Sequence, residues 1–164
     1  MRRRWSRPMD THRVSKIYGL IQSALLCAFA AAVLFGPATP RLLGGEAARI
    51  LGGIFCAAGL LLLFAAINRL GRAIQIDPAP RSDATLVTTG IYRWFRHPIY
   101  TAILMMVIGL FLRRATLPVA VAGAIVILFL AVKVSFEQQL LTARYPDYPE
   151  YKRKTWGLLP GLHW

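Results

Sequence analysis

Four long apolar runs constrain this chain more than any other feature of its sequence. Ile17 to Phe35 and Ala47 to Ile67 come close to the roughly 20 apolar residues with which a helix crosses a bilayer core. Pro98 to Leu112 is shorter, and Ala115 to Val132 continues as a helical pattern to about Arg144. With 56% hydrophobic and 16% charged residues, the chain is too apolar for an ordinary soluble domain. We therefore predict an all-α, polytopic membrane helical bundle with about four transmembrane helices.

Basic residues are distributed unevenly, and this distribution predicts an orientation. The formal net charge is +13, from 20 basic and 7 acidic residues. Most basic residues lie in residues 1–16, in residues 69–97 and in the tail from residue 133, which share one side if four spans alternate. The positive-inside bias then places both termini in the cytoplasm, with a bacterial-type inner (plasma) membrane as the setting. Because the charges flank spans, we expect a lipid bilayer as partner and no nucleic acid.

The chain is predicted to form one domain over residues 1–164, beginning with a basic cytoplasmic arm over residues 1–16. Arg113 and Arg114 indicate a tight turn, so the third and fourth apolar runs should pack as an antiparallel hairpin. A helix from Ala115 to Arg144 would be roughly 45 Å long, so its end must project into the cytosol. The proline-containing stretch 145–151 then breaks the helix and is predicted to fold back as a cytoplasmic C-terminal cap.

The stretch from Leu86 to Tyr100 gathers polar and aromatic groups where the third apolar run begins. It contains Arg96 and His97, followed by Pro98, which stiffens the turn. A span needs no such collection to cross a bilayer, whereas a membrane enzyme that draws a polar cofactor from the cytosol does.

Each of these groups also has an ordinary structural explanation. Arg96 can anchor to lipid phosphate, and His97 can cap the helix that follows it. Glu137 can form an ion pair with Lys133, four residues earlier on the same helical face. The tyrosines can belong to an interfacial aromatic belt. The functional interpretation depends on the whole set of residues.

In this arrangement the chain resembles the isoprenylcysteine carboxyl methyltransferase family and its wider relatives, which include phospholipid and thiol methyltransferases. The resemblance covers roughly residues 68–160, the cofactor-binding motif region. The matching residues are Leu86–Tyr92, Arg96–Tyr100, Glu137, Leu140, Tyr145, Tyr148, Tyr151 and Pro160. One departure is that the family usually has two successive acidic residues where this chain has Glu137-Gln138. The resemblance implies that S-adenosylmethionine is the cofactor and that the site faces the cytoplasm.

The chemistry of S-adenosylmethionine agrees with these residue types. Aromatic faces attract its sulfonium, an interaction of about 0.5–2 kcal/mol. Glu137 can accept from its amino group, Arg96 can fork onto its carboxylate, and His97 can donate a hydrogen bond or act as a base. We assign catalytic roles to Arg96, His97 and Tyr100 and expect no metal. Cofactor binding is assigned to Tyr92, Arg96, His97, Pro98, Tyr100, Glu137, Gln138, Tyr148 and Tyr151.

The resemblance implies an integral membrane, S-adenosylmethionine-dependent methyltransferase that acts on an amphipathic or lipid-like acceptor. The carboxylate of an isoprenylcysteine-like substrate is one such acceptor, and we expect acceptors to enter between the second span and the third, near Leu70 and Ile99. A membrane reductase of the sterol-reductase type is an alternative, which NADPH binding would favour. A non-catalytic membrane accessory subunit is another, which failure to bind either cofactor would favour.

Overall fold

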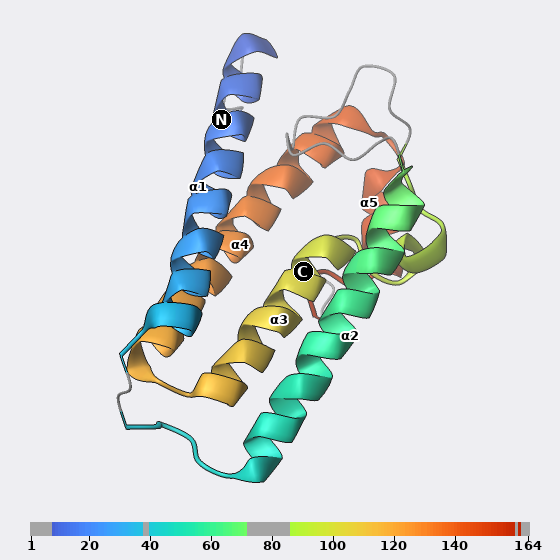
Figure 1. Cartoon of the computed structure of the whole chain (residues 1–164). Coiled ribbons are helices and arrows are strands. Elements are labelled where there is room, and N and C mark those ends of the chain that lie inside the picture. The colour runs from blue at the N-terminus through green and yellow to red at the C-terminus, as the bar shows by residue number, and fades with distance from the viewer. Residues whose placement is uncertain (1–7, 38–39, 72–85, 160, 162–164) are drawn as a thin grey trace.

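A computed structural model gives the chain as a bundle of long helices (Figure 1). The structure describes residues 8–37, 40–71, 86–159 and 161, with side chains from residue 13 onward. In chain order the elements are α1 (Pro8–Phe35), α2 (Glu46–Leu70), the short 3-10 helix η2 (Gly90–Arg93), α3 (Pro98–Arg114), α4 (Leu117–Arg144) and α5 (Tyr148–Lys154). No strand occurs within the described residues, so the all-α prediction is confirmed. Residues 1–7 of the predicted arm, most of the loop after α2 and Pro160 lie outside the description.

Three helices are long and apolar enough to cross a membrane. They are residues 13–35 of α1, the whole of α2 and the whole of α4, of 23, 25 and 28 residues. The third predicted span forms α3, which has only 17 residues and so runs for about 25 Å. Half-buried and buried side chains cover most of α3, whereas α1, α2 and α4 expose many large apolar side chains. Such apolar helices mark an integral membrane protein in which α3 is the most enclosed helix.

Helices α2 and α3 pack closely because glycines line their contact. A Cβ atom added to Gly52 would lie 2.5 Å from the carbonyl oxygen of Gly109. One added to Gly59 would lie 3.0 Å from the carbonyl oxygen of Ala102. Only residues without a side chain allow two helix backbones to approach in this way. These contacts involve other residues than Leu70 and Ile99, so the acceptor entrance expected near those two residues stays a prediction.

The apolar core lies where α1, α3 and α4 meet. Its buried members are Phe29, Ile103, Val107, Val119, Val126 and Leu130. Ile99 packs against this cluster, on the side of α3 that faces α1 and α4. A tight turn does join α3 to α4 at Ala115, whose φ of 47° is left-handed and whose carbonyl accepts from the Leu42 amide at 2.6 Å. The expected hairpin therefore exists, although α3 packs chiefly on α2, and α4 chiefly on α1.

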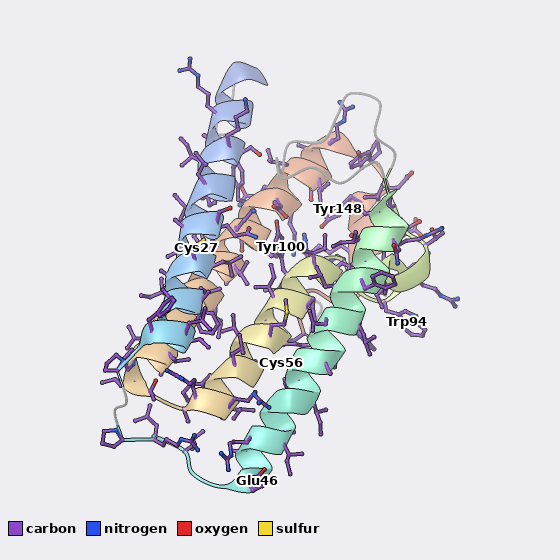
Figure 2. All side chains as sticks on the ribbon, viewed as in Figure 1. Cys27, Glu46, Cys56, Trp94, Tyr100 and Tyr148 are labelled. Carbon is purple, nitrogen blue, oxygen red and sulfur yellow. The ribbon has the colours of Figure 1, made fainter. Side chains whose placement is uncertain are left out.

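The tail folds back onto the start of α3, as predicted for the cap. After α5 the chain pairs with residues 94–97, the loop between η2 and α3. The amide of Arg96 donates to the carbonyl of Trp156 at 2.9 Å. The Trp156 amide in turn donates to the carbonyl of Trp94 at 2.8 Å. Figure 2 shows Tyr100 and Tyr148 toward this end of the bundle, with Glu46 at the opposite end.

Candidate functional site

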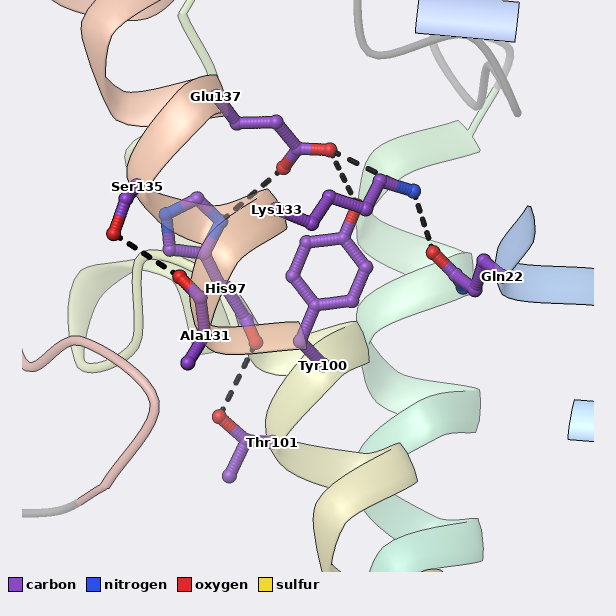
Figure 3. Close-up of polar contacts among 8 residues, drawn as sticks. All are labelled: Gln22, His97, Tyr100, Thr101, Ala131, Lys133, Ser135 and Glu137. Carbon is purple, nitrogen blue, oxygen red and sulfur yellow. Dashed lines mark hydrogen bonds and ion pairs between the residues drawn. The ribbon is translucent and has the colours of Figure 1, made fainter. Parts of the chain in front are cut away.

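Glu137 lies at the centre of a buried polar cluster that joins α3 to α4 (Figure 3). Its Oε1 accepts a hydrogen bond from the Tyr100 hydroxyl at 2.5 Å, and its Oε2 lies 3.7 Å from His97 Nδ1. Lys133 Nζ lies 3.8 Å from Oε1. The ion pair with Lys133 is thus one of three contacts. The fold thus brings His97 and Tyr100 of the Arg-His-Pro-x-Tyr motif to Glu137 across the hairpin of α3 and α4.

His97 precedes Pro98, the buried first residue of α3, yet its side chain makes no capping hydrogen bond. The ring is 6% exposed and stacks on Tyr100 with the two centroids 5.8 Å apart. Burial, then the charges of Arg96 and Lys152, lower the His97 pKa to about 3. The Glu137 carboxylate favours the protonated form but is beyond hydrogen-bond distance, so burial and the two cations prevail. The imidazole is therefore neutral at physiological pH.

Arg96 is 5% exposed and faces inward, which rules out the lipid-anchor explanation. Its Nη1 donates to the carbonyl of Thr155 at 2.9 Å and also to the carbonyl of Lys152. Burial lowers the pKa of its guanidinium, while the neighbouring tyrosines act in the opposite direction. The contacts make Arg96 the main tie between the motif and the tail.

The site tyrosines are also too deep for an interfacial belt. Tyr148 is 1% exposed and Tyr92 is buried, while the Tyr151 hydroxyl donates to the Tyr92 carbonyl at 2.6 Å. Burial raises the pKa of Tyr92 and of Tyr148 to about 12, and it also raises the pKa of Tyr151. These three phenols are therefore neutral at physiological pH and can donate hydrogen bonds, but they are not bases.

Some buried polar atoms at this end have no hydrogen-bond partner among the described residues. They include His97 Nε2, Gln138 Nε2 and Tyr148 Oη. Buried polar atoms are normally satisfied, so such a group of orphans indicates a place where a ligand binds. Gln138 also lines an open pocket of about 520 Å³, a size typical of small-molecule sites. The other lining residues are Ser135, Gln139, Thr142, Ala143 and Lys152.

Sequence reasoning missed several members of this site. Lys152 reaches it only through the fold of the tail, and Gln22 comes from α1, where its Oε1 accepts from Lys133 Nζ at 2.5 Å. A signal for Gln22 existed, because it is the only strongly polar side chain in the first apolar run. No three His, Cys, Asp or Glu side chains gather as a metal site in the described part of the chain.

Comparison with known proteins agrees with this geometry. A family model described as phospholipid methyltransferase matches residues 47–148. The cobalt-zinc-cadmium resistance protein CzcN of Cupriavidus metallidurans is 34% identical over 60% of this chain and 45% of its own length. The nickel-cobalt-cadmium resistance protein NccN of Alcaligenes xylosoxydans xylosoxydans is 33% identical over 60% of this chain and 46% of its own. The protein-S-isoprenylcysteine O-methyltransferase of Dictyostelium discoideum is 26% identical over 68% of this chain and 49% of its own.

A solved structure shares the fold. It is that of the eukaryotic intramembrane Ras methyltransferase, isoprenylcysteine carboxyl methyltransferase, with a TM-score of 0.64 and 21% identity. The alignment covers 91% of this chain and 54% of that chain. The chain spans about half the length of the curated relatives it matches. These comparisons support neither the reductase nor the accessory-subunit alternative. Because the family match covers more than half of its residues, the chain belongs to the phospholipid methyltransferase family.

Proposed function

We propose that this protein is an integral membrane methyltransferase that uses S-adenosylmethionine and acts on an amphipathic acceptor. One observation carries the proposal: the Glu137 cluster, with a neutral His97 and phenol hydroxyls, adjoins buried polar atoms that lack partners in the described residues. Such atoms need a polar ligand, and the family of the chain indicates which ligand to test.

The donor set fits S-adenosylmethionine. Glu137 Oε2, beyond hydrogen-bond distance from His97, is an acceptor for the amino group. Gln138, whose buried amide nitrogen has no partner among the described residues, and Lys152 both line the open pocket. An amide N–H and an ammonium suit a carboxylate or a ribose hydroxyl. Tyr92, Tyr148 and Tyr151 supply aromatic faces, which favour a sulfonium.

The bound cofactor would supply an activated methyl group. The nucleophilic atom of the substrate would bond to the methyl carbon as the carbon–sulfur bond breaks and the thioether leaves. The chain's own contribution is alignment and the exclusion of water. Arg96 acts here as a positioning residue that holds the tail over the motif. Tyr100, fixed by its bond to Glu137, and the neutral ring of His97 form the wall of the site.

The site favours an acceptor that is already an anion. A His97 pKa near 3 makes the imidazole a poor base, and the three phenols hold their protons. Among the described residues, the buried charged groups are Arg96, Lys133 and Glu137, two cations and one anion. An anionic acceptor such as a carboxylate balances the excess positive charge and needs no proton removed. The carboxylate of an isoprenylcysteine-like amphiphile has these properties.

The decisive experiment is methyl transfer by the purified protein in lipid nanodiscs. Tritiated S-adenosylmethionine is offered with a prenylated cysteine that has a free carboxylate, with its amide, and with an amine phospholipid. Base treatment then releases label from a methyl ester as methanol, but not from a methylated amine or thioether. We expect base-labile label in the free carboxylate alone. Calorimetry without an acceptor reports cofactor binding separately, and NADPH binding without S-adenosylmethionine binding would overturn the proposal.

The orientation with both termini in the cytoplasm is part of the proposal. Single cysteines replace Ser6, Leu159 or Gly44 in a background that lacks Cys27 and Cys56. A membrane-impermeant maleimide on intact cells should label position 44 and leave positions 6 and 159 unlabelled until the cells are lysed. Labelling of position 6 or 159 before lysis would reverse the assigned orientation.

A further inference from the structure

A buried cation in α4 is not used by the proposed cofactor contacts. The Lys133 side chain is 3% exposed, within a helix that is long and apolar enough to cross a membrane. Its Nζ donates to Gln22 Oε1 at 2.5 Å and lies 5.2 Å from the centre of the Tyr100 ring (Figure 3). An ionisable side chain inside a span is costly and generally serves a function.

The group that holds this cation comes from α1, which lies outside the residues matched by the family model. Elsewhere α1 meets α4 through apolar and aromatic contacts. Tyr18 stacks on Phe136 with their ring centroids 5.0 Å apart, and Phe29 joins the core. Gln22 is thus a polar contact in a mostly apolar seam, which packing alone does not require.

The distances indicate what this contact does. Lys133 Nζ lies 3.8 Å from Glu137 Oε1, beyond the roughly 2.7–3.2 Å of an N–H···O hydrogen bond. Its charge acts on the carboxylate, but the ammonium does not occupy either oxygen. Oε1 remains bonded to Tyr100, and Oε2 faces His97 at 3.7 Å without a hydrogen bond.

We propose that Gln22 is a positioning residue, which holds Lys133 away from Glu137 and so keeps Glu137 Oε2 available to the cofactor. This role rests on the proposed function. Without the Gln22 amide, the Lys133 ammonium would form a hydrogen bond with the Glu137 carboxylate. It would then compete with the amino group of S-adenosylmethionine for that carboxylate. Helix α1 thereby completes a site whose other residues come from η2, the loop between η2 and α3, α3, α4 and the tail.

Gln22→Leu tests the role, because it keeps the bulk of the side chain and removes the acceptor. We expect the dissociation constant for S-adenosylmethionine, measured by calorimetry in nanodiscs, to rise about three- to tenfold. Gln22→Glu restores an acceptor for Lys133 and should remain within about twofold of wild type. Ser23→Leu is the matched control, since Ser23 is the next residue, is exposed and bonds only to its own helix at Gly19.

A second background separates positioning from packing. If Gln22 acts through Lys133, then Gln22→Leu should cause no further loss of S-adenosylmethionine affinity in a Lys133→Met protein. Lys133→Gln provides a second background in case the Lys133→Met protein does not fold. Losses that add in both backgrounds would overturn the role. So would an unchanged affinity of Gln22→Leu in a wild type that binds the cofactor and transfers methyl groups. A wild type that binds no S-adenosylmethionine would instead overturn the proposed function, and this role with it.

Discussion

The two ends of the α2–α3 pair are held together by different means. Near Gly52 and Gly109 the two backbones touch, and the contact depends on the absence of side chains. At the other end η2 and the loop before α3 are joined to the tail by hydrogen bonds from side chains to main-chain carbonyls. Arg96 donates to the carbonyl of Thr155, and Tyr151 of the tail donates to the carbonyl of Tyr92. Close backbone packing leaves no room for an added group. A hydrogen-bonded contact, in contrast, can exchange one of its partners for a ligand. The proposed site lies at the end where such exchange is possible.

The largest effect is expected at the tie between motif and tail. Arg96→Met removes two hydrogen bonds from a charged donor, which should cost about 3 kcal/mol or more. We expect most cofactor affinity to be lost and the tail to exchange its amide hydrogens faster. Arg93→Met is the control, because Arg93 is exposed and only stacks over Trp94. If a folded Arg96→Met protein bound the cofactor with wild-type affinity, the tail would not be needed for cofactor binding.

Glu137→Gln should have the next largest effect. It replaces the carboxylate that would accept from the cofactor's amino group, so binding should weaken by about 1.5–3 kcal/mol in calorimetric titration. Glu150→Gln makes the same chemical change at an exposed residue of α5, whose partner is Lys154, and should leave the affinity for the cofactor unchanged. If both variants bind alike at normal thermal stability, Glu137 serves only as a structural partner of Lys133 and Tyr100.

At the glycine end, a methyl group should alter stability and not binding. Gly52→Ala places a Cβ against the Gly109 carbonyl and should destabilise the protein by about 1–3 kcal/mol. At the neighbouring Gly53 a Cβ meets only the mobile end of Arg113, 3.2 Å away, so Gly53→Ala should be neutral or slightly stabilising. Equilibrium unfolding in detergent measures the difference. Equal effects of the two substitutions would show that the close approach of α2 and α3 is absent.

The smallest effect concerns pH. The folded His97 pKa of about 3 lies below the unfolded value near 6.5, so between these values the unfolded chain binds the proton and the folded one does not. Stability should therefore fall as the pH drops below 6.5, by about 1 kcal/mol between pH 7 and pH 5.5. Above pH 7 the contribution of His97 is constant. The free energy of unfolding of wild type and of His97→Gln, measured across this pH range, isolates the contribution of His97. Parallel plots of that free energy against pH would contradict a buried neutral imidazole.

The sequence predicted the elements well because each depends on a local pattern. Apolar length located α1, α2 and α4, and the run that was expected to begin at Pro98 does begin α3 there. The predicted hairpin between the third and fourth runs also accounts for the contacts of His97 and Tyr100 with Glu137, since a hairpin returns the chain to the same end. The cap could be foreseen from the prolines that end α4.

What could not be predicted depends on which helices pair. Small residues in the second apolar run could pack against any neighbouring helix, so their contact with α3 in particular was not predicted. The carbonyls that accept hydrogen bonds from Arg96 belong to Lys152 and Thr155. Every residue has such a main-chain carbonyl, so residue types do not indicate which ones Arg96 contacts. Gln22 was visible as a polar residue in a span, but its partner Lys133 lies 111 positions away.

The order of synthesis gives the tail a further consequence. Helices α1 to α4 precede residues 152–158 in the chain, so Arg96 is synthesised well before the two carbonyls that accept its hydrogen bonds. Thr101 likewise waits for Leu158, whose carbonyl accepts from the Thr101 hydroxyl at 2.9 Å. The site is therefore complete only once the tail has been synthesised, and any change that shortens or displaces residues 152–158 acts on α3 as well.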